Sequence, residues 1–211
     1  MMDRDAYLQE TFHCDDSVLA GILQRMRESD MPPISVLPSL GRLLTLLVKI
    51  SGAQKVLEIG ALGGYSGVCL ARGLEKGGTL TSLELNPAFA EFARTSLEQA
   101  GFAEQVRYRV GPAASSLASL VREEARFDFF FIDADKPNYA NYLDYVLQMA
   151  LPGALVCADN ILLGDRILDS ANQDASVVGM RTFVQRLTAD PRLESVGLPI
   201  GDGFAIARVA R

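Results

Sequence analysis

The strongest constraint on the fold comes from two short apolar runs, each followed at once by acidic residues. Phe127–Ile132 leads into Asp-Ala-Asp-Lys at 133–136, and residues 154–158 lead into Asp-Asn at 159–160. Short apolar runs bounded by turn residues are typical of strands buried inside a parallel sheet. Because ligands bind at the carboxyl ends of such strands, we expect both acidic clusters at a ligand site.

Strand and helix patterns alternate along most of the chain. After an N-terminal helical section at 7–28, apolar spacing predicts strands at 55–59, 79–83, 105–110, 127–132 and 154–159, with helices at 38–50, 65–74, 87–101, 115–124, 139–150 and 177–189. Residues 192–198 and 204–209 predict an antiparallel hairpin. Five βα repeats and a hairpin predict a doubly wound, Rossmann-like α/β sheet of seven strands.

The bulk properties indicate one domain without a membrane or nucleic-acid partner. The 211 residues suffice for a single domain, with an N-terminal helical segment at 1–34 and a catalytic core at 35–211. No apolar stretch approaches the roughly 20 residues that cross a bilayer, and the acidic start has no signal-peptide pattern. Three cysteines without paired spacing favour a cytoplasmic protein, and the formal net charge of −6 argues against a nucleic-acid surface.

The first predicted strand ends in a glycine-rich turn that is typical of a cofactor site. Residues 59–66 read Ile-Gly-Ala-Leu-Gly-Gly-Tyr-Ser, so the backbone can approach a ligand next to a helix N-terminus. The spacing differs from the Gly-x-Gly-x-x-Gly of nicotinamide-cofactor folds, and Glu58 would repel a pyrophosphate. S-adenosylmethionine fits better, because it has an ammonium group and a carboxylate that Ser66 and the helix N-terminus could hold.

Glu84 closes the second predicted strand, where an acid commonly grips the two hydroxyls of a ribose. The loop at 111–114 would flank the adenine. In the alternative interpretation the glycines form only a tight turn, and Glu84 is a solvated residue at the end of its strand. The combination of strand, glycines, helix and acid favours the cofactor site.

The two acidic clusters predict a site for a hard cation. In the doubly wound order the fourth strand lies between the first and the fifth, so Asp133 and Asp159 converge at neighbouring strand ends. Their carboxylates would repel each other unless a cation sits between them. With the Asn160 carboxamide they suit Mg²⁺, Mn²⁺ or Ca²⁺ rather than zinc. Lys136 could take a proton from a hydroxyl that the metal acidifies, and Asp135 would point towards the cofactor.

Structural roles compete with this interpretation. Asp-Ala-Asp can cap a helix and Asp-Asn can form a turn, so each cluster alone favours a structural role. Their coincidence at adjacent strand ends favours the metal site. We predict that Asp128 is structural, that the phenylalanines at 127 and 129–131 are core residues, and that His13 has no catalytic role.

A set of motifs extends from about Ser35 to the C-terminus. They are Leu57-Glu58-Ile59-Gly60, Gly64-Tyr65-Ser66, residues 131–136, Asn138-Tyr139, Tyr142, Asp159-Asn160 and residues 198–203. Together they resemble the cation-dependent O-methyltransferases, which include caffeoyl-CoA O-methyltransferases and, more distantly, catechol O-methyltransferase. The resemblance implies the class I S-adenosylmethionine-dependent methyltransferase fold.

The resemblance also implies residue roles. It implies that Asp133, Asp159 and Asn160 bind Mg²⁺, that Lys136 is the base, and that Asp133 and Tyr142 meet the substrate. The residues that it places around S-adenosylmethionine are Val36, Glu58, Gly60, Ser66, Glu84, Ala113 and Asp135. Family members are typically homodimers whose N-terminal segment helps to shape the substrate mouth, so we expect a homodimer.

The chain departs from the family pattern at two places. Many members carry an aromatic residue soon after the Asp-Asn pair, whereas residues 161–164 here are Ile-Leu-Leu-Gly. The plant arginine that meets the CoA tail has no clear counterpart at 165–178. We therefore expect a small ortho-dihydroxy aromatic acceptor, of the catechol type, rather than a CoA ester.

Three other functions are weighed against this one. Some bacterial relatives methylate a hydroxylated tRNA base, but this chain is acidic and has no stripe of Lys and Arg. A nucleotide-dependent oxidoreductase is disfavoured by the glycine spacing and by Glu58. A non-catalytic S-adenosylmethionine-binding protein is disfavoured by Lys136 and the three cation ligands.

Overall fold

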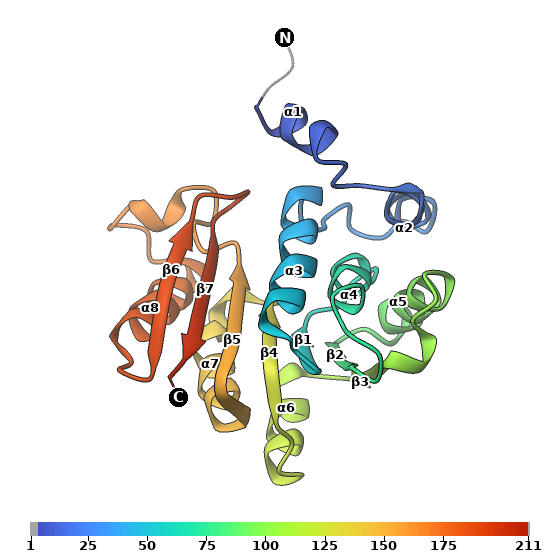
Figure 1. Cartoon of the computed structure of the whole chain (residues 1–211). Coiled ribbons are helices and arrows are strands. Elements are labelled where there is room, and N and C mark those ends of the chain that lie inside the picture. Colours follow the sequence, from blue (N-terminus) through green and yellow to red (C-terminus); the bar gives the residue numbers. More distant parts are fainter. Residues whose placement is uncertain (1–3, 211) are drawn as a thin grey trace.

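The fold is a seven-stranded sheet with helices on both faces (Figure 1). The computed structural model describes residues 4–210. The strand order is β3-β2-β1-β4-β5-β7-β6. The strands are β1 (Lys55–Ile59), β2 (Thr79–Glu84), β3 (Val106–Val110), β4 (Phe127–Ile132), β5 (Ala150–Asp159), β6 (Leu193–Leu198) and β7 (Phe204–Val209). β1 to β5 are parallel, and β6 and β7 form the antiparallel hairpin, so the predicted fold is confirmed.

Two helical layers cover the sheet, with α3, α4 and α5 on one face and α6, α7 and α8 on the other (Figure 1). The helices are α1 (Arg4–Thr11), α2 (Ser17–Glu28), α3 (Pro38–Ser51), α4 (Tyr65–Ala71), α5 (Pro87–Gln99), α6 (Ala113–Arg122), α7 (Tyr139–Met149) and α8 (Ala175–Ala189), with three short 3-10 turns, η1 (Ala103–Gln105), η2 (Lys136–Asn138) and η3 (Arg166–Leu168). No helix within residues 4–210 is long and apolar enough to cross a membrane.

The apolar run of β4 supplies both cores. Successive side chains of a strand point to opposite faces of the sheet. Phe129 and Phe131 accordingly pack with α2, α3 and α4, while Phe130 and Ile132 pack with α6, α7 and α8. A strand buried on both faces needs an unbroken apolar sequence, which explains why this run has no polar alternation.

Element boundaries differ from the sequence-based expectations where local caps or register intervene. The N-terminal helical section at 7–28 is two helices, because Asp16 caps α2 by accepting hydrogen bonds from Val18 N and Leu19 N. The fifth strand starts at Ala150, which pairs with Phe127 before the register shifts, and not at 154. The helix expected at 115–124 begins at 113, directly after Pro112.

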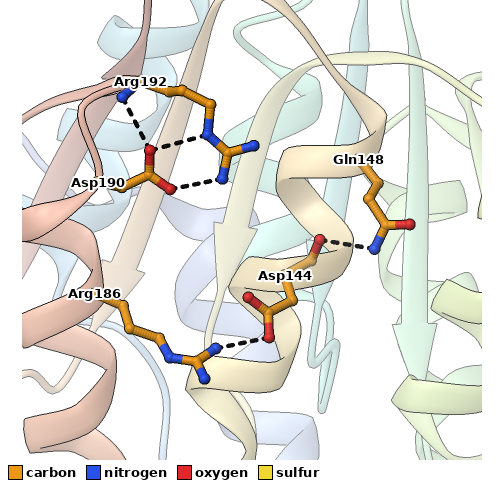
Figure 2. A network of polar contacts seen from close by, with 5 residues as sticks. All are labelled: Asp144, Gln148, Arg186, Asp190 and Arg192. Atoms are coloured by element: carbon orange, nitrogen blue, oxygen red, sulfur yellow. Dashed lines mark hydrogen bonds and ion pairs between the residues drawn. The ribbon is translucent and has the colours of Figure 1, made fainter.

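Asp128 has the structural role that its sequence predicts. From β4 its carboxylate accepts hydrogen bonds from the backbone amides of Gln54 and Lys55, each at 2.9 Å, where β1 begins. Asp144 offers a contrast. Figure 2 shows it on α7, where Arg186 of α8 donates to its carboxylate at 2.7 Å. Both partners of that ion pair are about half exposed, at 49% for Arg186 and 57% for Asp144.

We expect Asp128→Ala to lower the free energy of unfolding by about 1–3 kcal/mol, because two backbone amides lose their acceptor. Asp144→Ala is the matched control and should cost less than about 1 kcal/mol, because it removes only an exposed ion pair. Urea unfolding measures both values. Equal losses in the two variants would contradict the structural role of Asp128.

Candidate active site

A cavity of about 970 Å³ opens at the carboxyl ends of the parallel strands. Its wall combines the turns after β1, β2, β3, β4 and β5 with the linker between α2 and α3. The structure brings together at this cavity all but one of the residues predicted from the sequence, namely Val36, Gly60, Ser66, Glu84, Ala113, Asp133, Asp135, Lys136, Tyr142, Asp159 and Asn160. The exception is Glu58.

The glycine turn and the first acidic cluster are packed directly against each other. Gly60 has a φ of +103°, and a Cβ atom there would lie 2.0 Å from the carbonyl oxygen of Asp133. Asp133 N also donates to the carbonyl of Ile59 at 2.9 Å. Only glycine permits this approach, so the glycine turn and the first acidic cluster form one continuous wall.

Glu84 organises the glycine turn from the end of β2. Its carboxylate accepts hydrogen bonds from Leu62 N at 2.8 Å, Ala61 N at 3.2 Å and Asn86 N at 2.9 Å. A carboxylate has about four acceptor positions, so one is left for a hydroxyl in the cavity. The sequence predicted the ribose contact, whereas the support that Glu84 gives to the turn emerges from the structure.

Glu58 lies behind the cavity wall. It is fully buried, and its two carboxylate oxygens accept hydrogen bonds from the hydroxyls of Ser66 at 2.6 Å and Ser82 at 2.5 Å. Burial raises the pKa of Glu58 to about 7, although both serine hydrogen bonds oppose the shift. Glu58 therefore reaches the cavity through Ser66. Ser82 was missed by the sequence analysis, and the β1–β2 register, which pairs it with Glu58, is what places it there.

The carboxylate of Asp159, at the end of β5, has few neighbouring groups that compensate its negative charge. Asp159 is only 5% exposed, and its carboxylate accepts a hydrogen bond from Asn160 N at 2.8 Å. Burial, and next the Asp133 carboxylate, raise the pKa of Asp159 to about 7. A cation beside these two carboxylates would remove the repulsion.

The donor set fits a hard divalent cation. Asn160 adopts a φ of +61°, a left-handed conformation that asparagine tolerates better than most residues. It lines the cavity together with Asp133 and Asp159. Within residues 4–210 no three His, Cys, Asp or Glu side chains gather as metal ligands, so the carboxamide is needed as the third donor. Two carboxylates and one carboxamide suit Mg²⁺ and leave room for further oxygen ligands.

Lys136 reaches the acidic pair from the turn η2. Its Nζ donates hydrogen bonds to Asp133 Oδ1 and to the hydroxyl of Tyr139, both at 2.8 Å. Asp135 accepts hydrogen bonds from the Tyr142 hydroxyl and from the Asn138 side chain. The hydroxyl of Tyr142, predicted at the substrate, is thus directed to Asp135. Tyr139 was included in a sequence motif but was given no role by the sequence analysis.

Apolar residues also line the cavity. The linker after α2 contributes Pro32, Pro33 and Ile34, and Ile34 is 64% exposed although it lines the cavity. Leu85 and Phe89, which follow β2, belong to the same apolar lining. The cavity therefore combines polar groups that can meet hydroxyls with apolar side chains that can pack against a hydrocarbon.

Glu58 makes the stability depend on pH. Its usual pKa is 4.5 and its pKa in the fold is about 7, so between these values the folded state holds a proton that the unfolded chain has lost. The free energy of unfolding therefore falls as pH rises from 4.5 to 7. We expect Glu58→Gln to reduce this fall by up to about 3 kcal/mol.

Urea unfolding across this pH range checks the expectation. Glu75→Gln, at an exposed position, controls for the removal of one carboxylate. An unchanged pH slope in Glu58→Gln would contradict the role given to this buried acid.

Comparison of the chain with known proteins identifies its family. The sequence profile described as O-methyltransferase matches residues 9–210. A catechol O-methyltransferase from Niastella koreensis is 38% identical over 97% of this chain and 96% of its own length. Caffeoyl-CoA O-methyltransferase 1 from Zea mays is 37% identical over 80% of this chain and 69% of its own length.

A solved structure agrees with the sequence matches. The O-methyltransferase from Bacillus cereus in complex with SAH superposes with a TM-score of 0.93 at 37% identity, covering 97% of this chain and 96% of that one. These matches confirm the resemblance that the motifs carry. The chain therefore belongs to the O-methyltransferase family, and it is an O-methyltransferase.

Proposed function

We propose that this enzyme is a divalent-cation-dependent O-methyltransferase that transfers the methyl group of S-adenosylmethionine to a small ortho-dihydroxy aromatic. One observation carries the proposal: Asp133, Asp159, Asn160 and Lys136 line the same cavity as the glycine turn. The donor site and the acceptor site are therefore within one space of about 970 Å³.

The cofactor would occupy the side of the cavity formed by β1, β2 and β3. Glu84 has an acceptor position left for a ribose hydroxyl, and Gly60 and Ser66 form the turn and helix start beside it. Val36, Ala113 and Asp135 complete this side. Glu58 would act on the cofactor through Ser66. The Bacillus cereus enzyme, solved with SAH, supports this assignment.

The acceptor would lie against Asp133, Asp159 and Asn160, which we call the acidic floor of the cavity. Asp133, Asp159 and Asn160 would hold Mg²⁺, or Mn²⁺ or Ca²⁺ in its place. When bound, such a cation supplies positive charge that lowers the pKa of a nearby hydroxyl. Lys136 would accept the hydroxyl proton, and the oxygen anion would attack the sulfonium methyl in line while the methyl–sulfur bond breaks and S-adenosylhomocysteine leaves. The residues contribute mainly by fixing the distance and angle between oxygen and methyl.

The shape of the cavity supports a small acceptor. Pro32, Pro33 and Ile34 add apolar surface to the cavity that the acidic residues line, and S-adenosylmethionine would take much of its space. The name of the Niastella koreensis relative points to a catechol. Tyr142 would flank the acceptor with its ring, because its hydroxyl is engaged by Asp135.

We also propose a homodimer built on one catalytic domain. Phe12 and Ile50 are 64% and 79% exposed, and a second copy would cover such apolar side chains. The linker at 32–36 lines the cavity, so the helical segment at 1–34 and the core at 35–211 would work as one unit. Light scattering of the purified protein tests the dimer.

Methyl transfer tests the proposed function. We expect labelled methyl from S-adenosylmethionine to appear on catechol when Mg²⁺ is present and not when EDTA replaces it. Asp133→Ala should abolish the metal stimulation. Lys136→Met should lower kcat by roughly 100-fold to 10,000-fold, the usual range for a positioned base. Asp144→Ala is the control, because Asp144 is not among the residues that line the cavity.

Other outcomes would identify another function. Full activity of Asp133→Ala in EDTA would refute the cation dependence. Labelling of tRNA, and of no small aromatic, would indicate the nucleic-acid substrate. Cofactor binding without transfer to catechols, caffeoyl esters, flavonoids or tRNA would indicate a non-catalytic binding protein.

A further inference from the structure

Tyr139 is the first residue of α7, and its hydroxyl lies beside the Lys136 amine. We propose that Tyr139 is a positioning residue, whose hydroxyl holds Lys136 Nζ at the acidic floor of the cavity. This inference rests on the proposed function, because it gives Tyr139 a task only if Lys136 acts on the acceptor hydroxyl.

The hydroxyl of Tyr139 is fixed to the sheet itself. It lies 3.3 Å from the carbonyl oxygen of Ile132 and 3.2 Å from that of Asp159, which are the last residues of β4 and β5. A hydroxyl has one hydrogen to donate and can accept at the same time. It therefore donates to one of these carbonyls while it accepts the hydrogen bond from Lys136 at 2.8 Å.

The ring of Tyr139 has little freedom to move. It is fully buried, and Phe183 of α8 packs edge-on against it with ring centroids 5.3 Å apart. Lys136 Nζ lies 4.9 Å from the centre of the same ring. Both the ring and the hydroxyl therefore give Lys136 a fixed surface, which the long and flexible lysine side chain lacks by itself.

The backbone of Lys136 is held independently by α8. Gly179 lies so close to η2 that a Cβ atom there would be 2.8 Å from the carbonyl oxygen of Lys136 and 2.7 Å from Cα of Pro137. Because the main chain is fixed in this way, the place of Nζ depends on the side-chain torsions. Tyr139 and Asp133 are the two contacts that set them.

These two contacts leave one direction open. A lysine nitrogen has four tetrahedral directions, of which one is the bond to Cε and two point to Asp133 and Tyr139. The fourth is free for an acceptor hydroxyl in the cavity that Lys136 lines. Asp133 would also share its carboxylate with the cation, whereas the Tyr139 hydroxyl accepts its hydrogen bond from Lys136 while it donates to the main chain.

The test is Tyr139→Phe, which keeps the ring and removes the hydroxyl. A misplacement of about 1 Å can cost roughly 100-fold in rate, so we expect kcat for catechol to fall about 10-fold to 100-fold. The KM values for catechol and S-adenosylmethionine should stay within about twofold, because substrate binding does not depend on this hydroxyl.

A double-mutant cycle separates positioning from structural support. If Tyr139 acts through Lys136, adding Tyr139→Phe to Lys136→Met should change kcat by less than about twofold. A merely structural role would give the same loss in both backgrounds. Tyr108→Phe is the matched control, since the buried Tyr108 hydroxyl has no hydrogen-bond partner within residues 4–210, and it should keep the kcat of the original enzyme.

A nitro-substituted catechol gives a second readout that does not depend on the amount of folded enzyme. One of its hydroxyls is already ionised at mildly alkaline pH, so it needs little help from Lys136. The rate ratio of nitrocatechol to catechol, measured in one preparation of Tyr139→Phe, should exceed that of the original enzyme about 10-fold or more.

The outcomes distinguish the two proposals. An unchanged kcat of Tyr139→Phe, an unchanged nitrocatechol ratio, or an equal loss in the Lys136→Met background would overturn the role of Tyr139. Failure of the unaltered enzyme to methylate any catechol would instead refute the proposed function.

Discussion

The close approach of the β1 turn to the end of β4 is the constraint on which the site depends. Gly60 lies against the main chain of Asp133, with no room for a side chain between them. The residues that we propose for the cofactor and those that we propose for the acceptor therefore share one backbone contact. Any shift of the glycine turn would move the acidic floor with it, so the distance between methyl donor and acceptor is set by the sheet.

Four carboxylates of the site, those of Glu58, Glu84, Asp133 and Asp159, accept hydrogen bonds from different kinds of donor. Glu58 accepts from two serine hydroxyls, Glu84 from three backbone amides, and Asp133 from a lysine amine. Asp159 accepts from one backbone amide and is the most weakly compensated of the buried acids. The least compensated of these carboxylates is thus one of the two that we propose as cation ligands.

The sequence predicted what depends on local patterns. The apolar period placed the seven strands, and the helix expected from residue 87 begins at Pro87, with Asn86 as its cap. Of the 12 residues predicted for the site, 11 line one cavity. Those at strand ends meet there because the doubly wound topology brings the ends together, whereas Val36 and Tyr142 were implied by the family resemblance. The predictions failed where a long-range contact decides. The direction of the Glu58 side chain depends on Ser82 of the neighbouring strand, and the early start of β5 depends on pairing with Phe127.

Tyr139 illustrates why the role of such a residue escapes sequence analysis. Its apolar neighbours give it the helical spacing of an ordinary core residue, and its hydroxyl binds main-chain carbonyls, which have no sequence signature. A buried hydroxyl must nevertheless find a partner, because leaving it unpaired costs free energy. Here that requirement is met at the ends of β4 and β5, the same strand ends that carry Asp133 and Asp159. The carboxyl ends of β4 and β5 therefore present the acidic residues and also anchor the Tyr139 hydroxyl, which orients Lys136.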